Sequence, residues 1–320
     1  MTFCADIFER KVTDILIPGG KDYPALIGDD NLPFENAGVL KTTGFELQAK
    51  WSDKLSNGFA YSVGVALSDD KAEVLSYPSN PTNKIGDGVL YKGYTVGDIW
   101  GYETGGILQE SDFDGVGPNG KPLYHGAYFK GGQPYPGYVW YQDLDHDGVI
   151  TSGLSTVDDP GDKKVIGNNA PRYRYNITAN FQYKGFDLDL MFQGVGKRDY
   201  WLKDVSSYWG GGAGSWETYN QSWTPERTDA KFPMYGSGIG SYAQSGYLLD
   251  ASYIKLKQVI LGYTFPKALI GKVGLEKLRL NIAAYNLFTL SDVPKYYDSD
   301  YLSDAYPPKR TFSVGIQVGF

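Results

Sequence analysis

Residues 143–151, with the sequence DLDHDGVIT, form the segment of this chain that is best suited to bind a metal ion. Its first, third and fifth positions carry carboxylates: Asp143, Asp145 and Asp147. Gly148 at the sixth position permits a sharp turn, and the carbonyl of Val149 would supply a further oxygen. Because alternate carboxylates on such a turn converge on a hard cation, the spacing predicts a loop that binds Ca²⁺.

The second half of this loop departs from the usual calcium motif. The twelfth position, where a bidentate acid is normal, is Leu154. The next acids along the chain are Asp158, Asp159 and Asp162. Two interpretations therefore stay open: a metal site whose closing acid is displaced, and a solvated turn rich in aspartate that binds no metal.

The chain offers little material for catalysis. Its 320 residues include two histidines, His125 and His146, and one cysteine, Cys4, which excludes an internal disulfide and a cysteine-based zinc site. A glycine-rich phosphate loop, a GxSxG elbow and HExxH or CxxC motifs are all missing from the sequence. The net charge of −7 provides no basic surface for nucleic acid. We therefore expect a protein that is not an enzyme and does not bind nucleic acid.

Alternation of apolar and polar residues with a period of two is the dominant pattern of the chain, and it predicts β-strands. Eight segments carry it: Thr2–Glu9, Phe45–Trp51, Phe59–Ser68, Tyr173–Tyr183, Phe186–Gln193, Tyr253–Phe265, Leu278–Phe288 and Thr311–Phe320. Strands of about ten residues can cross a bilayer at a tilt, whereas the strands of a soluble sandwich usually have about five or six. Aromatic residues gather near the strand ends, as in the girdles of membrane barrels.

The connections between these strands alternate between short and long. The short ones are residues 52–58, 184–185 and 266–277, and the long ones are residues 11–44, 69–172, 195–252 and 289–310. This order is typical of an antiparallel transmembrane β-barrel with small turns on one side and large extracellular loops on the other. The first ten residues do not form a signal peptide, so for an exported protein we expect this chain to be the later part of a longer one.

Polar side chains on the other face of the strands would line the interior of such a barrel. The candidates for a solute path are Glu46, Gln48, Lys50, Arg174, Asn176, Asn180, Asp187, Asp189 and Gln193. The alternative for any one of them is a polar wall that only holds the barrel together.

Six stretches, taken in order, resemble motifs of the SusC-like (RagA-like) TonB-dependent outer-membrane transporters of the Bacteroidetes. They are Asn36–Leu47, Gly93–Tyr102, Asp143–Ile150 with its continuation to Gly167, Ala251–Tyr263, Tyr285–Thr289 and Tyr306–Phe320. The second has Thr95 where the family usually has proline, and in the third Asp162 takes the place of the closing acid after an insertion of about eight residues. The resemblance spans nearly the whole chain.

The resemblance implies the C-terminal part of a large, plugged, all-β barrel in the outer membrane of a Gram-negative bacterium. Such transporters import nutrients, often glycans and sometimes peptides, together with a SusD-like surface lipoprotein, and TonB acts through the plug. The plug is not among these residues. A different class of protein remains as an alternative, namely a small complete eight-stranded barrel or a secreted carbohydrate-binding β-protein.

Overall fold

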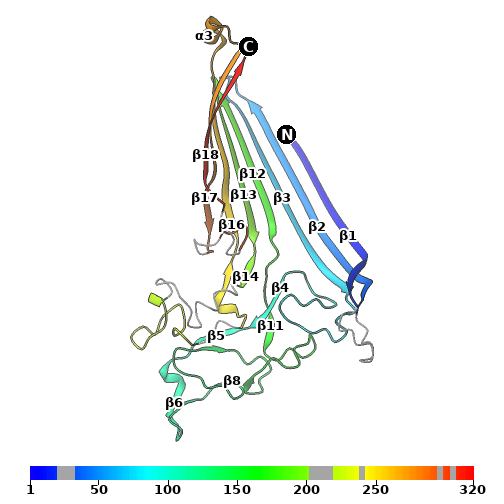
Figure 1. The fold of residues 1–320 in the computed structure, drawn as a ribbon, viewed down its shortest axis with the longest axis vertical. Helices are drawn as coiled ribbons and strands as arrows, with labels where there is room; N and C mark the ends of the chain where they lie inside the picture. Colours follow the sequence, from blue (N-terminus) through cyan, green and yellow to red (C-terminus); the bar gives the residue numbers. More distant parts are fainter. Residues whose placement is uncertain (20–32, 202–218, 238–241, 294–297, 303–307) are drawn as a thin grey trace.

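The computed structural model describes residues 1–19, 33–201, 219–237, 242–293, 298–302 and 308–320. Its main feature is an eight-stranded antiparallel sheet in which strands that follow one another along the chain are also neighbours (Figure 1). The strands are β1 (Thr2–Pro18), β2 (Phe34–Lys54), β3 (Ala60–Ser76), β12 (Arg172–Tyr183), β13 (Phe186–Lys197), β16 (Tyr253–Thr264), β17 (Lys277–Ser291) and β18 (Thr311–Gly319). All eight predicted strands are therefore confirmed, together with their antiparallel order.

Short turns join these strands at one end of the sheet, as predicted. Lys184 and Gly185 form the two-residue turn between β12 and β13, and both have positive φ, 48° and 88°. A type I′ hairpin turn requires this conformation at both of its central residues, because its twist matches that of the flanking strands. Between β16 and β17 the chain forms two short helices, α3 (Lys267–Ile270) and η6 (Gly271–Val273).

The strands are longer than predicted, so the boundaries of the expected loops are corrected. Residues 11–18 and 34–44 belong to β1 and β2, and residues 69–76 belong to β3. The pairing of β1 with β2 continues from Thr2 opposite Lys50 to Pro18 opposite Phe34, with bulges after Val12. A β-ladder is held by backbone hydrogen bonds, which persist after the apolar alternation ends. Alternation therefore reports only the part of a strand that has one apolar face.

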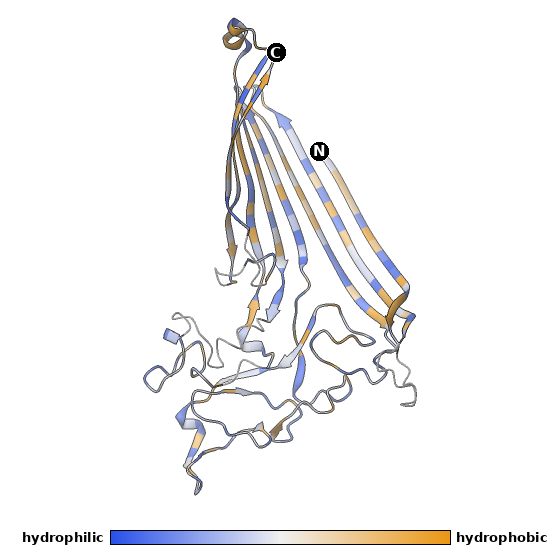
Figure 2. Ribbon diagram, viewed as in Figure 1, coloured by the Kyte–Doolittle hydropathy of each residue, from blue (hydrophilic) through white to orange (hydrophobic). Residues whose placement is uncertain are grey.

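The sheet is open in the described part of the chain, with β1 and β18 as its two edges and no pairing between them. An eight-stranded barrel would close by pairing its first and last strands, so the small complete barrel considered above is not the structure formed here. Apolar and polar residues alternate along the strands in Figure 2.

The long connections form a separate layer of short elements at the other end of the sheet (Figure 1). They contain the strands β4 (Asp98–Tyr102), β5 (Thr104–Ile107), β6 (Phe113–Val116), β7 (Pro122–Tyr124), β8 (Tyr128–Phe129), β9 (Val139–Tyr141), β10 (Val149–Ile150), β11 (Lys163–Asn168), β14 (Asp199–Trp201) and β15 (Leu248–Asp250), and the 3-10 helices η2 (Glu110–Asp112) and η5 (Ser245–Tyr247). Three small cores are found here among the described residues: Tyr102, Val139, Tyr141 and Ile150 in the first, Val74, Ile85, Tyr91 and Tyr94 in the second, and Ala251, Val293 and Leu302 in the third. Among the described residues, no helix has the length and apolar character needed to span a membrane.

Candidate functional site

The register of the sheet places the polar and apolar side chains of neighbouring strands on opposite faces. Residues opposite one another in a ladder point to the same face, so Leu188, Leu261, Ile282 and Val314 form one apolar row across four strands. The adjacent row, which faces the other way, contains Asp189, Ile260, Ala283 and Ser313. In the apolar row, Val314 is 77% exposed and Ile282 is 57% exposed. The sheet therefore has one face that presents aliphatic side chains and one that is mainly polar.

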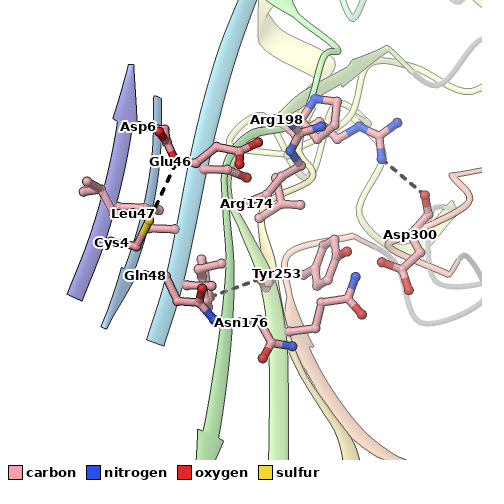
Figure 3. A pocket seen from close by; sticks show the side chains of 18 residues that line it. Cys4, Asp6, Glu46, Leu47, Gln48, Arg174, Asn176, Arg198, Tyr253 and Asp300 are labelled. Atoms are coloured by element: carbon pink, nitrogen blue, oxygen red, sulfur yellow. Dashed lines mark hydrogen bonds between the residues drawn. The ribbon is translucent and has the colours of Figure 1, made fainter. Parts of the chain in front are cut away.

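The polar face is hollowed near the layer of loops. We call this feature the upper hollow, because it lies on the side of the long loops, which Figure 1 draws at the bottom. It has a volume of about 600 Å³ (Figure 3). Its lining includes five of the residues predicted for the solute path: Glu46, Gln48, Arg174, Asn176 and Gln193. Asp6, Arg198 and Asp300 complete its charged lining, and Tyr175 and Tyr253 are its aromatic residues.

A second hollow, the lower hollow, lies on the same face near the short turns and has a volume of about 590 Å³. It contains three more of the predicted residues, Asn180, Asp187 and Asp189. Asp187 accepts two hydrogen bonds from the guanidinium of Arg279, at 3.0 and 2.5 Å, and Asn180 donates to Asp189. The last predicted residue, Lys50, shares this face through its pairing with Gly64 but lines neither hollow.

Sequence reasoning missed a buried ion cluster that fastens the last loop to the sheet. The Nζ atom of Lys255 lies 2.8 Å from both carboxylate oxygens of Asp298 and 2.9 Å from Asp300, and Lys257 donates to the same oxygen of Asp300 at 3.0 Å. Lys255 is only 3% exposed. Burial alone would raise the pKa of Asp300, but the hydrogen bonds from Tyr253 and the two lysines lower it below its usual value. A basic residue on the polar side of a predicted membrane strand is the sequence signal that could have revealed this cluster.

A second ion pair closes the junction between β3 and β12. The guanidinium of Arg172 donates two hydrogen bonds of 2.5 Å to the carboxylate of Asp69, which is 6% exposed. The backbone N–H of Tyr173, a residue with φ of 53°, donates to the same carboxylate. These contacts pair and solvate the buried carboxylate, as a buried charge requires.

The acidic loop brings together Asp143, Asp145 and Asp162, whose carboxylate oxygens lie within 4.8 Å of one another. Asp162 is fully buried, and its two oxygens accept the backbone N–H groups of Leu144 and Thr151, each at 2.7 Å. Asp162, the displaced closing acid, therefore joins the two ends of the loop. The N–H groups that it binds lie 18 and 11 residues before it in the chain.

The other predicted ligands of this loop are arranged differently. The carboxylate of Asp147 accepts the backbone N–H of Val149 at 2.8 Å and lies outside the group of three. Within the described residues, the buried Oδ1 atom of Asp143 has no hydrogen-bond partner. An unpartnered buried carboxylate oxygen beside two further carboxylates suits a hard cation, so the residues present fit Ca²⁺.

The pKa values of two acids in the loop reflect this crowding. Burial opposes ionisation of Asp143, but the backbone N–H groups of Gly148, His146 and Asp147 lower its pKa. For Asp145, the backbone N–H of Asp147 lowers the pKa, whereas burial and the negative charges of Asp162, Asp147 and Asp143 together raise it. A bound cation would remove this repulsion.

Comparisons with known proteins find relatives of one kind along nearly the whole chain, although no family model matches it. TonB-dependent receptor P3 of Formosa agariphila is 26% identical over 98% of this chain and 32% of its own length. TonB-dependent receptor SusC of Bacteroides thetaiotaomicron is 26% identical over 57% of this chain and 19% of its own length. A structure of the RagAB peptide importer in an open-open state superposes with a TM-score of 0.70 at 20% identity, covering 99% of this chain and 32% of that one. The chain thus spans about a third of the length of P3, and its fold is that of a TonB-dependent transporter barrel.

Proposed function

We propose that this chain, which resembles the C-terminal barrel of SusC/RagA-like TonB-dependent receptors, forms part of the wall of an outer-membrane nutrient transporter. The observation that supports this most directly is the apolar row of Leu188, Leu261, Ile282 and Val314, which crosses four neighbouring strands on one face. Such a band suits hydrocarbon, and the polar opposite face suits a water-filled lumen. The wall carries solute and performs no chemistry.

The partners follow from the same resemblance. We propose that a SusD-like lipoprotein covers the loop side and that the TonB complex acts through a plug that lies outside these residues. The substrate is a glycan or a peptide. The proposed solute path runs along the polar face through both hollows, past Glu46, Lys50, Arg174, Asn176, Asn180, Asp187 and Asp189.

The test measures which face meets lipid in the natural protein. Single cysteines are introduced after Cys4→Ser, which removes the exposed native thiol, and each carries a spin label. Labels at Ile177, Leu190 and Val314 should be reached by oxygen dissolved in lipid. Labels at Thr178, Asp187 and Ser313 should be reached by a water-soluble quencher. The reverse pattern would contradict both the membrane assignment and the transport function.

We also propose that the acidic loop binds Ca²⁺ through Asp143, Asp145, Asp147 and Asp162, with the carbonyl of Val149 as a further ligand. Support comes from the three carboxylates that meet within 4.8 Å and from the unpartnered oxygen of Asp143. The ion would fasten a loop segment that lies outside the sheet. Calcium titration of the natural protein, followed by protease resistance of residues 141–167, tests this proposal.

A further inference from the structure

The end of β17 on the side of the long loops has a neighbouring strand on only one of its two edges. β18 begins at Thr311, which lies opposite Tyr285, whereas β17 continues to Ser291. In the part of the chain that the structure describes, residues 286–291 therefore have β16 as their only neighbouring strand. A free strand edge leaves backbone N–H and C=O groups that need another partner, so this edge is open to a ligand.

A pocket of about 460 Å³ lies beside this free edge, and we call it the rim pocket. Its lining includes Phe288 and Thr289 of β17, Ser299 of the last loop and Arg310, the residue before β18. Ser299 is 2% exposed, and its buried Oγ atom has no hydrogen-bond partner among the described residues. Buried hydroxyl groups are normally hydrogen-bonded, so this side chain favours a ligand that carries a hydrogen-bonding group.

The rim pocket carries an excess of positive charge. Lys255 and Asp298, which also line it, neutralise one another in the ion cluster, and Lys257 does the same for Asp300. Arg310 is exposed and forms no hydrogen bond or ion pair with the described residues, so its charge is unbalanced. Its planar guanidinium offers paired N–H donors that match the oxygens of a phosphate or carboxylate. The pocket therefore favours an oxyanion.

The position of Arg310 along the chain assigns this oxyanion to the level of lipid headgroups. The apolar face of β18 consists of Phe312, Val314, Ile316 and Val318, which are 43–77% exposed. Arg310 comes two residues before Phe312, which is about 7 Å along an extended chain and about 5 Å along the membrane normal at a tilt of about 40°. The headgroup region extends about 5–7 Å beyond the hydrocarbon core on each side. Arg310 therefore lies within that region if the apolar face meets hydrocarbon.

One wall of the rim pocket belongs to the apolar face. Phe288 is paired with Leu256, and Leu256 is paired with Phe192, which lies on the same side of β13 as Leu188 of the apolar row. Phe288 is 41% exposed, and Leu290 on the same face is 63% exposed. A ligand in the pocket thus meets an anion-binding group on one side and exposed apolar surface on the other. This combination suits an anionic lipid better than a small soluble anion.

We propose that the rim pocket binds the phosphate headgroup of a membrane lipid from the leaflet on the long-loop side. Arg310 pairs with the phosphate, the hydroxyl of Ser299 donates to one of its oxygens, and the acyl chains lie along Phe288. This inference rests on the proposed position of the sheet in the outer membrane and adds a lipid site to it. An inorganic phosphate ion would satisfy Arg310 and Ser299 but would gain nothing from Phe288.

The test is native mass spectrometry of the natural protein in detergent, titrated with dioleoyl phosphatidic acid. Dioleoylglycerol serves as the matched probe, because it has the same acyl chains and no phosphate. Inorganic phosphate is added as a competitor. We expect one phosphatidic acid to bind roughly tenfold more tightly than dioleoylglycerol, because only the phosphate forms the charge-assisted contact with Arg310. Inorganic phosphate at the same concentration should leave this binding unchanged.

Variants assign the site. Arg310→Gln should weaken phosphatidic acid roughly tenfold and leave dioleoylglycerol unchanged, whereas Arg310→Lys, which keeps the charge but loses the paired donors, should weaken it less. Ser299→Ala should weaken it about threefold, the loss expected for one hydrogen bond. The matched control is Arg10→Gln. Arg10 is exposed and lies four residues from Asp6 on β1, so this variant removes the same charge from the polar face.

Three outcomes would overturn the inference: equal binding of the two lipids, an effect of Arg310→Gln no larger than that of Arg10→Gln, or displacement of phosphatidic acid by an equal concentration of inorganic phosphate. The last outcome would assign the pocket to a soluble anion. None of them touches the transport function if the spin labels at Ile177, Leu190 and Val314 still report lipid. Labels that report water at those sites would remove both conclusions together.

Discussion

The ion cluster around Lys255 should hold the last loop in place, and Lys255→Ala tests this. The side chain of Lys255 is 4% exposed and makes three hydrogen bonds of 2.8–2.9 Å to Asp298 and Asp300, whose side chains are 15% and 18% exposed. Removing one partner of a buried ion pair costs about 3–5 kcal/mol. Lys257 still binds Asp300 in the variant, so we expect the lower end of that range, about 3 kcal/mol.

The lost stability should appear as local opening of the loop, because the cluster joins residues 298–302 to β16. The cluster takes no part in the pairing of the other strands. The assay is hydrogen exchange of the natural protein in detergent. The amide of Leu302, which donates to the carbonyl of Asp298 at 2.9 Å, and the amide of Asp300, which donates to the Asp298 carboxylate at 2.9 Å, report the opening. A change of about 3 kcal/mol corresponds to roughly a hundredfold faster exchange at these amides.

Two further variants make this reasoning refutable. Lys257→Ala removes one hydrogen bond from a more exposed side chain and should accelerate exchange far less. Lys255→Ala leaves the carboxylate of Asp298 without its lysine partner. Adding Asp298→Asn removes that unpaired negative charge and should recover part of the lost protection against hydrogen exchange. Unchanged exchange in Lys255→Ala would show that the loop is held by other contacts, such as the packing of Leu302 with Ala251 and Val293.

Arginine placed on the apolar face, as in Ile177→Arg or Leu190→Arg, should destabilise the barrel by about 2–4 kcal/mol or block its assembly, whereas Thr178→Arg and Ser313→Arg on the polar face should be tolerated. Heat-modifiability of the natural protein on gels checks this, and equal tolerance at all four sites would contradict the assignment of faces. Calcium should slow proteolysis of residues 141–167, and Asp145→Ala should remove this protection; equal cleavage with calcium and with chelator would favour the plain aspartate turn. The raised pKa of Asp145 means that the folded loop holds its proton to higher pH than the unfolded loop, so the loop without calcium should become more protease-sensitive as pH rises from about 4 to 6. Calcium should cancel that trend, which cleavage assays across this pH range would show.

The sequence alone determined the eight strands and the two faces of the sheet. Both depend on alternation within one segment, as in residues 173–183, and this pattern is visible without any knowledge of which strands pair. The first half of the acidic loop was equally readable, because Asp143, Asp145 and Asp147 are spaced within five residues. The resemblance to known transporters added Asp162, whose carboxylate the structure places beside Asp143 and Asp145.

Only the tertiary structure decided how far the strands extend and which charges meet. The outer parts of β1 and β2 lack a continuous apolar face, so only their ladder identifies them as strands. Lys255 and its partners Asp298 and Asp300 are 43 and 45 residues apart, and the hollow between Glu46 and Arg198 depends on the register of several strands. Alternation shows which face a side chain occupies, but its position along that face is set by long-range backbone pairing. If the register of one strand shifted by two residues, each of its side chains would stay on the same face but would lie opposite different neighbours, and the charges described here would no longer meet.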